Sequence, residues 1–302
     1  MTIPPYLKKG DRIGLVCPAG FLSPERFQSC LEQLTAWGFV PVTGKTMFST
    51  STSYFSGTDE ERLADLQEML DDPGIAAILC GRGGYGTSRI IDRLSFKKFR
   101  KHPKWVIGFS DITVLLAHIG RRYSIAAMHA PMAGAFANGE FANVWVQSLK
   151  AALAGKKGRY TTAPHPFNIP GKVTAPLAGG NLSLLAHMIG TPSMPKTRGR
   201  ILFLEDLGEY LYAIDRMMVQ LRRSGVLEGI GGLVLGGFTD LKDTDRPFGA
   251  TVDQLLQHHL KGSDFPVCFG FPVSHTRENY ALKTGVTYTL SVSAKSVRLT
   301  EQ

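Results

Sequence analysis

Residues 104–119, KWVIGFSDITVLLAHI, predict a buried strand joined to a helix by a very short turn. The apolar run of the strand ends at Ile107, and apolar residues then recur at helical spacing, at Ile112, Leu115, Leu116 and Ile119. Ser110 is therefore expected at the apex of the turn, beside the unpaired N–H groups of the helix start. Exposure and nearby donors are what a nucleophilic serine requires. The alternative is that Ser110 only caps the helix.

Strand-like and helix-like segments alternate through the first half of the chain. We expect strands at 12–16, 39–42 and 75–79 and helices at 24–37 and 59–70. This alternation predicts parallel βαβ connections and a doubly wound α/β sheet. Ligands of such sheets bind beyond the carboxyl ends of the strands, where the Ser110 turn and the glycine-rich residues 81–86 are both expected.

The second half of the chain has a different pattern. We expect strands at 200–204, 232–237, 286–290 and 297–299, with helices at 212–223 and 252–259. Between the halves, residues 133–172 turn from Ala/Asn/Gly-rich to Lys-rich and then to proline-containing. We therefore predict a first domain at 1–150, a linker at 151–172 and a second, mixed β/α domain at 173–302.

Composition and charge indicate an ordinary globular protein. The 302 residues are 43% hydrophobic and 20% charged, and 34 basic against 25 acidic residues give a net charge of +9. The basic residues are scattered in small groups without interleaved aromatic residues, so we expect no nucleic-acid partner. The positive charge suits an anionic small-molecule substrate, although it could serve solubility alone.

The four cysteines are far apart, with no C-x-x-C pair and no histidine at metal-ligand spacing. We therefore expect reduced cysteines, a cytoplasmic location and no metal site. The N-terminal residues lack the apolar region of a secretory signal. No apolar run approaches the roughly 20 residues of a membrane-spanning helix, so no membrane association is expected.

Residues 80–87, CGRGGYGT, form a glycine-rich stretch between the third expected strand and a helix-like segment at 88–94. Glycines allow a tight turn whose N–H groups face an anion. The stretch departs from the P-loop because Thr87-Ser88 replaces Lys-Ser/Thr, and the acidic residue of a dinucleotide fingerprint is absent. We favour an oxyanion-donating or carboxylate-binding loop over a nucleotide site.

A nucleophilic serine needs a base and an orienting acid. His275 lies in a strand-ending loop, 270–279, from which a polar group can reach a cleft, although it could be only a solvated loop histidine. His129 could line the site. His118 lies on the helix that follows Ser110 and is expected to pack against neighbouring side chains. For the acid, the buried strand at 201–204 leads directly into Glu205 and Asp206, which could alternatively serve helix capping and surface ion pairs.

Six blocks of sequence occur in the order found in one known family. They are GDRI at 10–13 with Pro18-Ala19, GRGGYG at 81–86, GFSD at 108–111, GGNL at 179–182, LED at 204–206 with IDR at 214–216, and His275 with Asn279 and Gly285. With these blocks, nearly the whole chain resembles the LD-carboxypeptidases, a serine peptidase family that also contains the microcin C immunity peptidases. The residues Leu282-Lys283-Thr284-Gly285 depart from the family's usual Leu-Pro-x-Gly stretch.

The resemblance implies a flavodoxin-like first domain, a swivelling β/α second domain and a site between them. It implies Ser110 as nucleophile, Glu205 as orienting acid and His275 as base. Glu209 is the rival of Glu205, which we prefer because it directly ends the strand. The oxyanion hole would comprise the backbone N–H of Asp111 and one from Gly83 or Gly84.

The implied reaction is hydrolysis of the L,D peptide bond to the terminal D-alanine of cytoplasmic murein tetrapeptides, in peptidoglycan recycling. It needs no cofactor or metal, and the family suggests a homodimer. We expect Arg82 or Tyr85 to recognise the terminal carboxylate of the substrate, the alternative for Arg82 being simple solvent exposure.

Two other functions remain open from the sequence. A microcin C type peptidase would cleave an aminoacyl-nucleotide amide and would need an aromatic platform, for which Trp145 is the candidate, although its spacing from Val144 and Leu149 also fits a core position. A non-catalytic protein that binds an anionic ligand would use Ser110 only as a helix cap.

Overall fold

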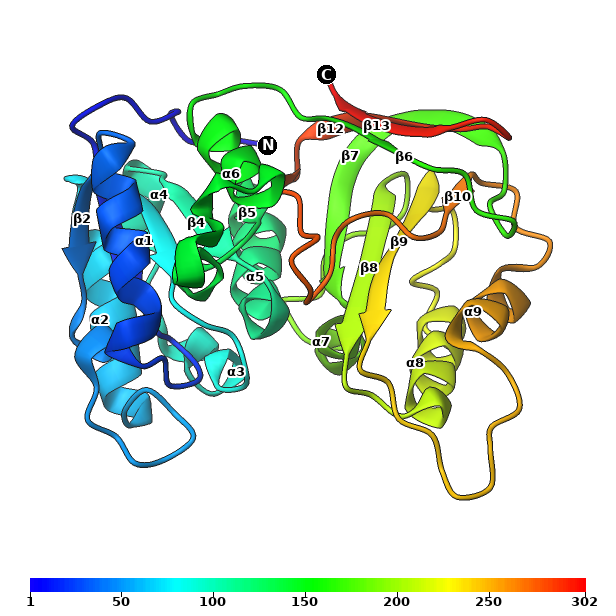
Figure 1. Cartoon of the computed structure of the whole chain (residues 1–302), viewed down its shortest axis with the longest axis horizontal. Coiled ribbons are helices and arrows are strands. Elements are labelled where there is room, and N and C mark those ends of the chain that lie inside the picture. Colours follow the sequence, from blue (N-terminus) through cyan, green and yellow to red (C-terminus); the bar gives the residue numbers. More distant parts are fainter. The chain divides into compact units, whose positions relative to one another are not determined.

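The computed structural model describes the side chains of residues 1–137 and 142–302, and the chain forms two compact units (Figure 1). The first unit comprises Met1–Lys156 together with Tyr280–Thr284, and the second comprises Lys157–Asn279 and Gly285–Gln302. The chain therefore returns to the first unit once, for five residues, before it completes the second. We describe each unit by itself.

The first unit is built on a six-stranded sheet. Its strands are β1 (Arg12–Val16), β2 (Val40–Thr43), β3 (Ile75–Cys80), β4 (Trp105–Gly108), β5 (Ala127–His129) and β11 (Leu282–Thr284). The order is β11-β5-β4-β3-β1-β2, in which the first five strands of the chain run parallel and β11 pairs antiparallel with β5. This is the flavodoxin-like order of a doubly wound sheet, so the predicted fold class is confirmed.

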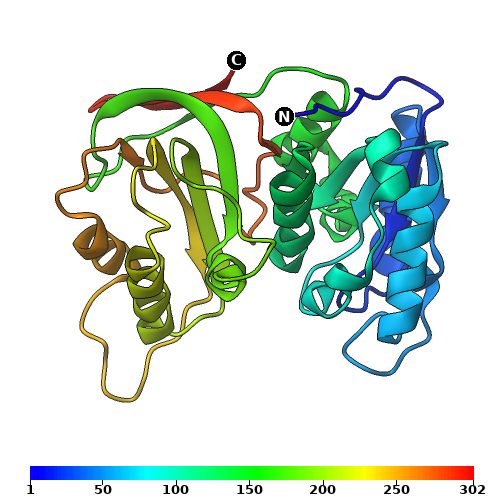
Figure 2. The same ribbon diagram turned by 180° about the vertical axis from the view of Figure 1, so that it is seen from behind.

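Helices cover both faces of this sheet. They are α1 (Pro24–Ala36), α2 (Asp59–Asp71), α3 (Thr87–Ile90), α4 (Lys97–Lys101), α5 (Thr113–Tyr123) and α6 (Val144–Leu153), with 3₁₀ helices η1 (Lys45–Phe48), η2 (Ile91–Arg93), η3 (Ser110–Ile112) and η4 (Ala133–Ala142). Helices α1 and α6 lie on the face seen in Figure 1, and α2 and α5 lie on the face seen in Figure 2. Because both faces are covered, β3 and β4 are almost entirely apolar and buried.

The order of the strands reverses between β1 and β3, which is the point where doubly wound sheets bind their ligands. The loops that leave these two strands are joined to each other by their backbones. The N–H of Gly81 donates to Val16 O (2.8 Å), and the N–H of Gly20 donates to Gly83 O (2.9 Å). The glycine-rich loop is thus held at the carboxyl edge of the sheet.

The second unit has a mixed seven-stranded sheet. Its strands are β6 (Arg159–Thr162), β7 (Gly171–Asn181), β8 (Ile201–Leu207), β9 (Gly232–Thr239), β10 (Val267–Cys268), β12 (Thr287–Val292) and β13 (Val297–Glu301). In the order β10-β9-β8-β7-β12-β13-β6, the strands from β10 to β7 are parallel and the remainder pair antiparallel. Helices α7 (Leu182–Met188), α8 (Leu211–Arg223) and α9 (Val252–Leu260) complete this mixed β/α unit, as predicted.

Among the elements that differ from the sequence prediction, three bear on the architecture. The helix expected at 88–94 consists only of the single turn α3 followed by η2. The long strand β7 was not predicted, because Pro176 and three glycines within it are residues that strands usually avoid. The predicted linker, 151–172, contains β6, which pairs with β13.

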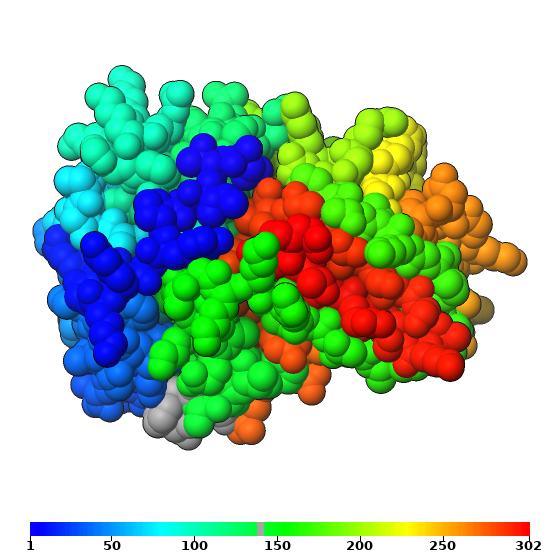
Figure 3. Space-filling model, turned by 90° about the horizontal axis from the view of Figure 1, so that it is seen from above, coloured from blue at the N-terminus to red at the C-terminus, as the bar shows by residue number. Residues whose placement is uncertain are grey.

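The first ten residues lie on the surface of the first unit, where Figure 3 shows them in dark blue. They are held by backbone hydrogen bonds from Thr2 N to Ser124 O (2.7 Å) and from Leu7 N to Leu153 O (2.9 Å). Throughout the described residues, every helix is too short or too polar to cross a membrane.

Asp65 on α2 fixes the chain after β2, and it provides a test of the fold. Its buried carboxylate accepts the backbone N–H groups of Lys45 (3.0 Å) and Thr46 (2.8 Å) and the Thr46 hydroxyl. We expect Asp65→Ala to lower the free energy of unfolding by about 2–4 kcal/mol, because it leaves buried donors without an acceptor. Glu68→Gln, one turn along α2 and exposed, should change it by less than about 0.5 kcal/mol. Equal effects of the two substitutions in urea unfolding would contradict this account.

Candidate active site

Ser110 stands at the start of η3, directly after β4 and before α5. Its backbone is left-handed, with φ of 60°, a conformation that is strained for a residue with a Cβ. The N-cap position of α5 is Ile112, and no side chain caps η3 or α5. A strained serine between a strand and a helix has the geometry of a nucleophile elbow rather than that of a helix cap.

The backbone of Gly83 lies directly against Ser110. A Cβ placed on Gly83 would lie 2.8 Å from Ser110 Cβ, 3.0 Å from Ser110 Oγ and 3.3 Å from Asp111 N, so only glycine fits there. Within the described part of the first unit, the N–H groups of Gly83 and Gly84 have no acceptor, whereas the Gly83 carbonyl accepts from Gly20. These N–H groups are thus available to an anion beside Ser110.

Asp111 joins the Ser110 turn to the end of the glycine-rich loop. Its buried carboxylate accepts the N–H of Thr87, the first residue of α3, at 2.8 Å. Burial raises the pKa of Asp111, opposed by hydrogen bonds from Thr87 and Gly86. This side chain therefore has a structural partner, and a role in the chemistry would fall to its backbone N–H.

The two residues predicted to bind the substrate carboxylate both lie in the glycine-rich loop. The guanidinium of Arg82 donates to Phe21 O in the loop after β1, at 2.7 Å. Tyr85 is 47% exposed, and its ring centroid lies 6.0 Å from that of Phe55. Arg82 thus helps to hold two loops together, and substrate binding by either residue stays a prediction.

Glu205 and His275 form a close pair in the second unit. Glu205 lies near the end of β8 and is fully buried, and its Oε2 lies 2.6 Å from Nδ1 of His275, whose side chain is 10% exposed. The pairing of β8 with β9 shifts between Leu204 and Asp206, so Glu205 lies at a local irregularity of the sheet. A carboxylate on Nδ1 orients the ring and leaves general-base chemistry to Nε2.

The surroundings of His275 favour its protonated form. Burial lowers the pKa of His275, but the hydrogen bond and the charge of Glu205 raise it, assisted by Asp206 and Asp240, and the net pKa is raised. His275 is therefore a stronger base than an exposed histidine. The rival acid Glu209 lies four residues beyond Glu205, and its backbone carbonyl accepts from the Lys242 N–H.

Two glycines of β9 allow the His275 loop to lie on the sheet. A Cβ on Gly236 would lie 2.1 Å from Val273 O, and the Gly237 N–H donates to the same carbonyl at 2.9 Å. Gly236 and Gly237 were not among the site residues predicted from the sequence. The signal was available, since paired glycines inside an expected strand mark a close approach of another backbone.

Asp206, beside Glu205, is the centre of a buried network that the sequence did not reveal. It accepts the Asn181 side-chain amide (2.9 Å) and the Ser183 N–H (2.9 Å), and Asn181 in turn caps α7 through Leu184 N. Burial raises the pKa of Asp206 to about 6. This network ties the GGNL block at 179–182 to the strand that carries Glu205.

The other aromatic and histidine candidates pack in the units that contain them. His118 is buried against Phe96, with ring centroids 5.3 Å apart, and the Trp145 ring meets Tyr280 edge to face at 4.4 Å. His129 is buried at the end of β5, 5.7 Å from the ring of Phe109. Among the described residues, no three His, Cys, Asp or Glu side chains gather as metal ligands would.

Comparison with known proteins agrees with these features. The family model described as the LD-carboxypeptidase N-terminal domain matches residues 13–130, and the model of the LD-carboxypeptidase C-terminal domain matches residues 174–290. The first match contains Ser110 and the glycine-rich loop, and the second contains Glu205 and His275.

Several relatives match over almost their whole length. A probable murein peptide carboxypeptidase of Bacillus subtilis is 33% identical, covering 97% of this chain and 92% of the relative. The crystal structure of muramoyltetrapeptide carboxypeptidase from Oxalobacter formigenes has a TM-score of 0.87 at 29% identity, covering 96% of this chain and 98% of that one.

The microcin C7 self-immunity protein MccF of Escherichia coli is 29% identical over 98% of this chain and 95% of the relative. A structure of MccF with aspartyl sulfamoyl adenosine has a TM-score of 0.88 at 26% identity, covering 100% of this chain and 99% of that one. The chain is therefore a serine-type hydrolase that belongs to the LD-carboxypeptidase family.

Proposed function

We propose that this protein is an LD-carboxypeptidase that releases the terminal D-alanine from murein tetrapeptides in the cytoplasm, in peptidoglycan recycling. The observation that carries the proposal is the left-handed Ser110 with the Gly83 backbone against it, because this combination provides a nucleophile and an anion site together. The names of the B. subtilis and O. formigenes relatives, a murein peptide and a muramoyltetrapeptide carboxypeptidase, support the substrate. The proposal includes a homodimer, as the family resemblance suggests.

In the proposed mechanism, His275 Nε2 removes the proton of Ser110 Oγ while Oγ attacks the carbonyl carbon of the L,D peptide bond. The negative charge that develops on the carbonyl oxygen is stabilised by the N–H of Asp111 and that of Gly83 or Gly84. The C–N bond then breaks, and His275 returns the proton to the leaving amine of D-alanine. The mechanism requires Ser110 Oγ and His275 Nε2 to reach hydrogen-bond distance in the working enzyme.

A water molecule completes the proposed cycle. It attacks the ester formed by Ser110, with His275 again as general base, and the shortened peptide leaves with a new carboxylate while the proton returns to Ser110 Oγ. Glu205 keeps the proton of the neutral ring on Nδ1 and stabilises the imidazolium that forms twice in each turnover. The 2.6 Å contact between Glu205 and His275 supports this role.

We propose that the terminal carboxylate of the substrate binds near Arg82 and Tyr85. Both residues are exposed and flank the glycines of the proposed oxyanion hole. The net charge of +9 suits a substrate with several carboxylates.

A second candidate is the cleavage of an aminoacyl-nucleotide amide, as the similarity to MccF suggests. Such a substrate would need an aromatic surface for its base. Trp145, the candidate platform, already packs edge to face on Tyr280, which favours the murein substrate.

Product analysis tests the reaction and the nucleophile together. We expect purified wild-type protein to release free D-alanine from murein tetrapeptide, and Ser110→Ala to release it at least about 1000-fold more slowly, because the covalent step is lost. A matched control is Ser88→Ala, which changes another serine of the same unit. Release by Ser110→Ala at the wild-type rate would contradict the serine mechanism, and release by neither protein would favour the nucleotide substrate or a binding role.

The pH dependence of kcat/KM tests the Glu205–His275 pair. General-base catalysis needs neutral His275, and its pKa is raised above the ordinary value of 6.5, so activity should rise with pH through a midpoint above 6.5. Glu205→Gln removes the charge that raises the pKa, so the midpoint should fall. Glu209→Gln should leave the midpoint in place, and an equal shift in both variants would exclude the assigned pairing.

A further inference from the structure

Arg62 on α2 is a charged side chain that the proposed mechanism does not use, and it is fully buried. A buried guanidinium is costly unless its donors are matched by acceptors. Its Nη1 donates to Pro18 O (2.6 Å) and Gly86 O (3.1 Å), its Nε donates to Gly57 O (3.3 Å), and its Nη2 binds the carboxylate of Asp59. Every nitrogen of this guanidinium therefore has an acceptor.

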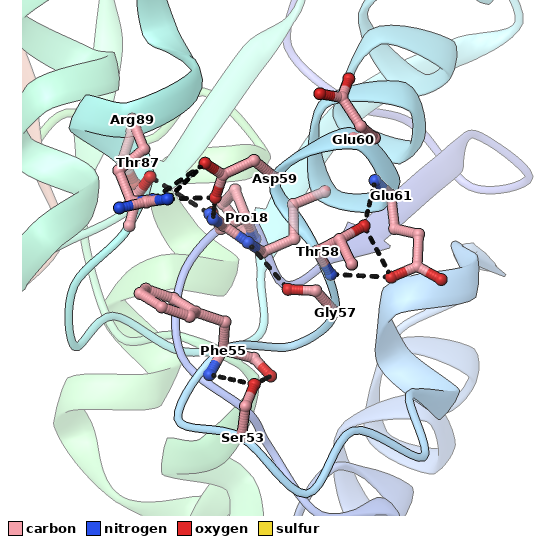
Figure 4. Close-up of polar contacts among 12 residues, drawn as sticks. Pro18, Ser53, Phe55, Gly57, Thr58, Asp59, Glu60, Glu61, Thr87 and Arg89 are labelled. Atoms are coloured by element: carbon pink, nitrogen blue, oxygen red, sulfur yellow. Dashed lines mark hydrogen bonds and ion pairs between the residues drawn. The ribbon is translucent and has the colours of Figure 1, made fainter.

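These acceptors come from three separate segments of the first unit. Pro18 lies in the loop after β1, Gly57 and Asp59 lie at the start of α2, and Gly86 ends the glycine-rich loop. In Figure 4, Pro18, Gly57 and Asp59 lie close to one another, and Arg89 binds the same Asp59 carboxylate from the other side. The guanidinium of Arg62 thus joins the loop after β1 and the glycine-rich loop after β3 to helix α2.

The fit at Gly86 is too close for any other residue. Gly86 has φ of 142°, and a Cβ there would lie 2.7 Å from Arg62 Nη1 and 3.2 Å from Ala19 Cα. At its other end, the loop is fixed by the Gly81 N–H on Val16 O. Gly83 and Gly84 lie between these two attachments, and Gly83 contacts Ser110.

We propose that Arg62 is a positioning residue that fixes the glycine-rich loop so that its N–H groups face the oxyanion formed at Ser110. It acts through the carbonyls of Gly86 and Pro18 and does not touch the substrate. The rigid fork of an arginine can donate to several carbonyls at once, which a single ammonium group cannot do in this geometry. This inference rests on the proposed function, because it assigns the oxyanion hole to this loop.

Kinetics of Arg62→Met and Arg62→Lys test the inference, with Arg89→Met as the matched control. Arg89 binds the same Asp59 carboxylate but is exposed; it meets the glycine-rich loop at the Tyr85 side chain and donates to no loop carbonyl. With D-alanine release as the assay, we expect Arg62→Met to lower kcat by about 30- to 300-fold with KM changed less than about threefold, since a displaced donor fails mainly in the transition state. Arg62→Lys should recover part of this loss, and Arg89→Met should stay within about threefold of the wild type.

If Arg62 has a purely structural role, a different result is expected. Substitution of Arg62 then lowers the midpoint of thermal unfolding, while kcat per folded molecule, measured well below that midpoint, stays at the wild-type value. That result would overturn the inference.

If neither Arg62 variant folds, Asp59→Asn keeps Arg62 but removes the charge that holds its Nη2. Its kcat should fall by about 3- to 10-fold relative to Arg89→Met, and an unchanged kcat would equally overturn the inference.

Hydrogen exchange separates this inference from the proposed function. If the wild-type protein releases no D-alanine, the proposed function fails, but the effect of Arg62 on the loop can still be measured. The amides of Gly86 and Thr87, which hydrogen-bond to the Asp111 carboxylate, should exchange at least about tenfold faster in Arg62→Lys, or in Asp59→Asn if that is the variant that folds, than in Arg89→Met. Equal exchange in the tested variant and its control would overturn the inference, whatever the activity.

Discussion

The close contact between the Gly83 backbone and Ser110 is the constraint on which the rest of the candidate site depends. It requires a glycine at position 83 and a loop held firmly enough to keep its backbone against the serine. The left-handed backbone of Ser110 adds strain that the surrounding structure must balance. The hydrogen bonds from Gly20, Thr87 and Arg62 hold the loop and the serine turn in place, because each ties one of them to a neighbouring segment.

In the second unit, an equivalent constraint holds the proposed catalytic base, His275. The Glu205–His275 pair depends on the shift in register between β8 and β9 at Glu205 and on Gly236 and Gly237 of β9, which let the histidine loop lie on the sheet. Asp206 adds a buried acceptor that joins β8 to Asn181 at the end of β7. Each unit thus supplies one half of the proposed chemistry from a rigid sheet, with the reactive groups at strand ends.

The sequence predicted the features that follow from local patterns. Apolar periodicity located β1, β3, β4 and α2, and the turn between β4 and η3 identified Ser110. The sequence could not reveal partners that are distant along the chain. From the sequence, Arg62 looks like an ordinary surface residue of α2, because its acceptors Pro18 and Gly86 are distant along the chain. Strand β7 was missed because it contains a proline and glycines. By contrast, the sequence did favour Glu205 over Glu209 as the partner of His275, because Glu205 directly ends the strand, and the two side chains lie 2.6 Å apart.

The proposed mechanism requires a covalent acyl-enzyme on Ser110, which mass spectrometry after acid quenching can detect. Wild-type protein mixed with excess murein tetrapeptide should gain the mass of the tetrapeptide minus D-alanine, on the proteolytic fragment that contains Ser110. The adduct should be absent from Ser110→Ala under the same conditions. An adduct on another residue, or D-alanine release with no adduct at any time during the first turnover, would contradict the account.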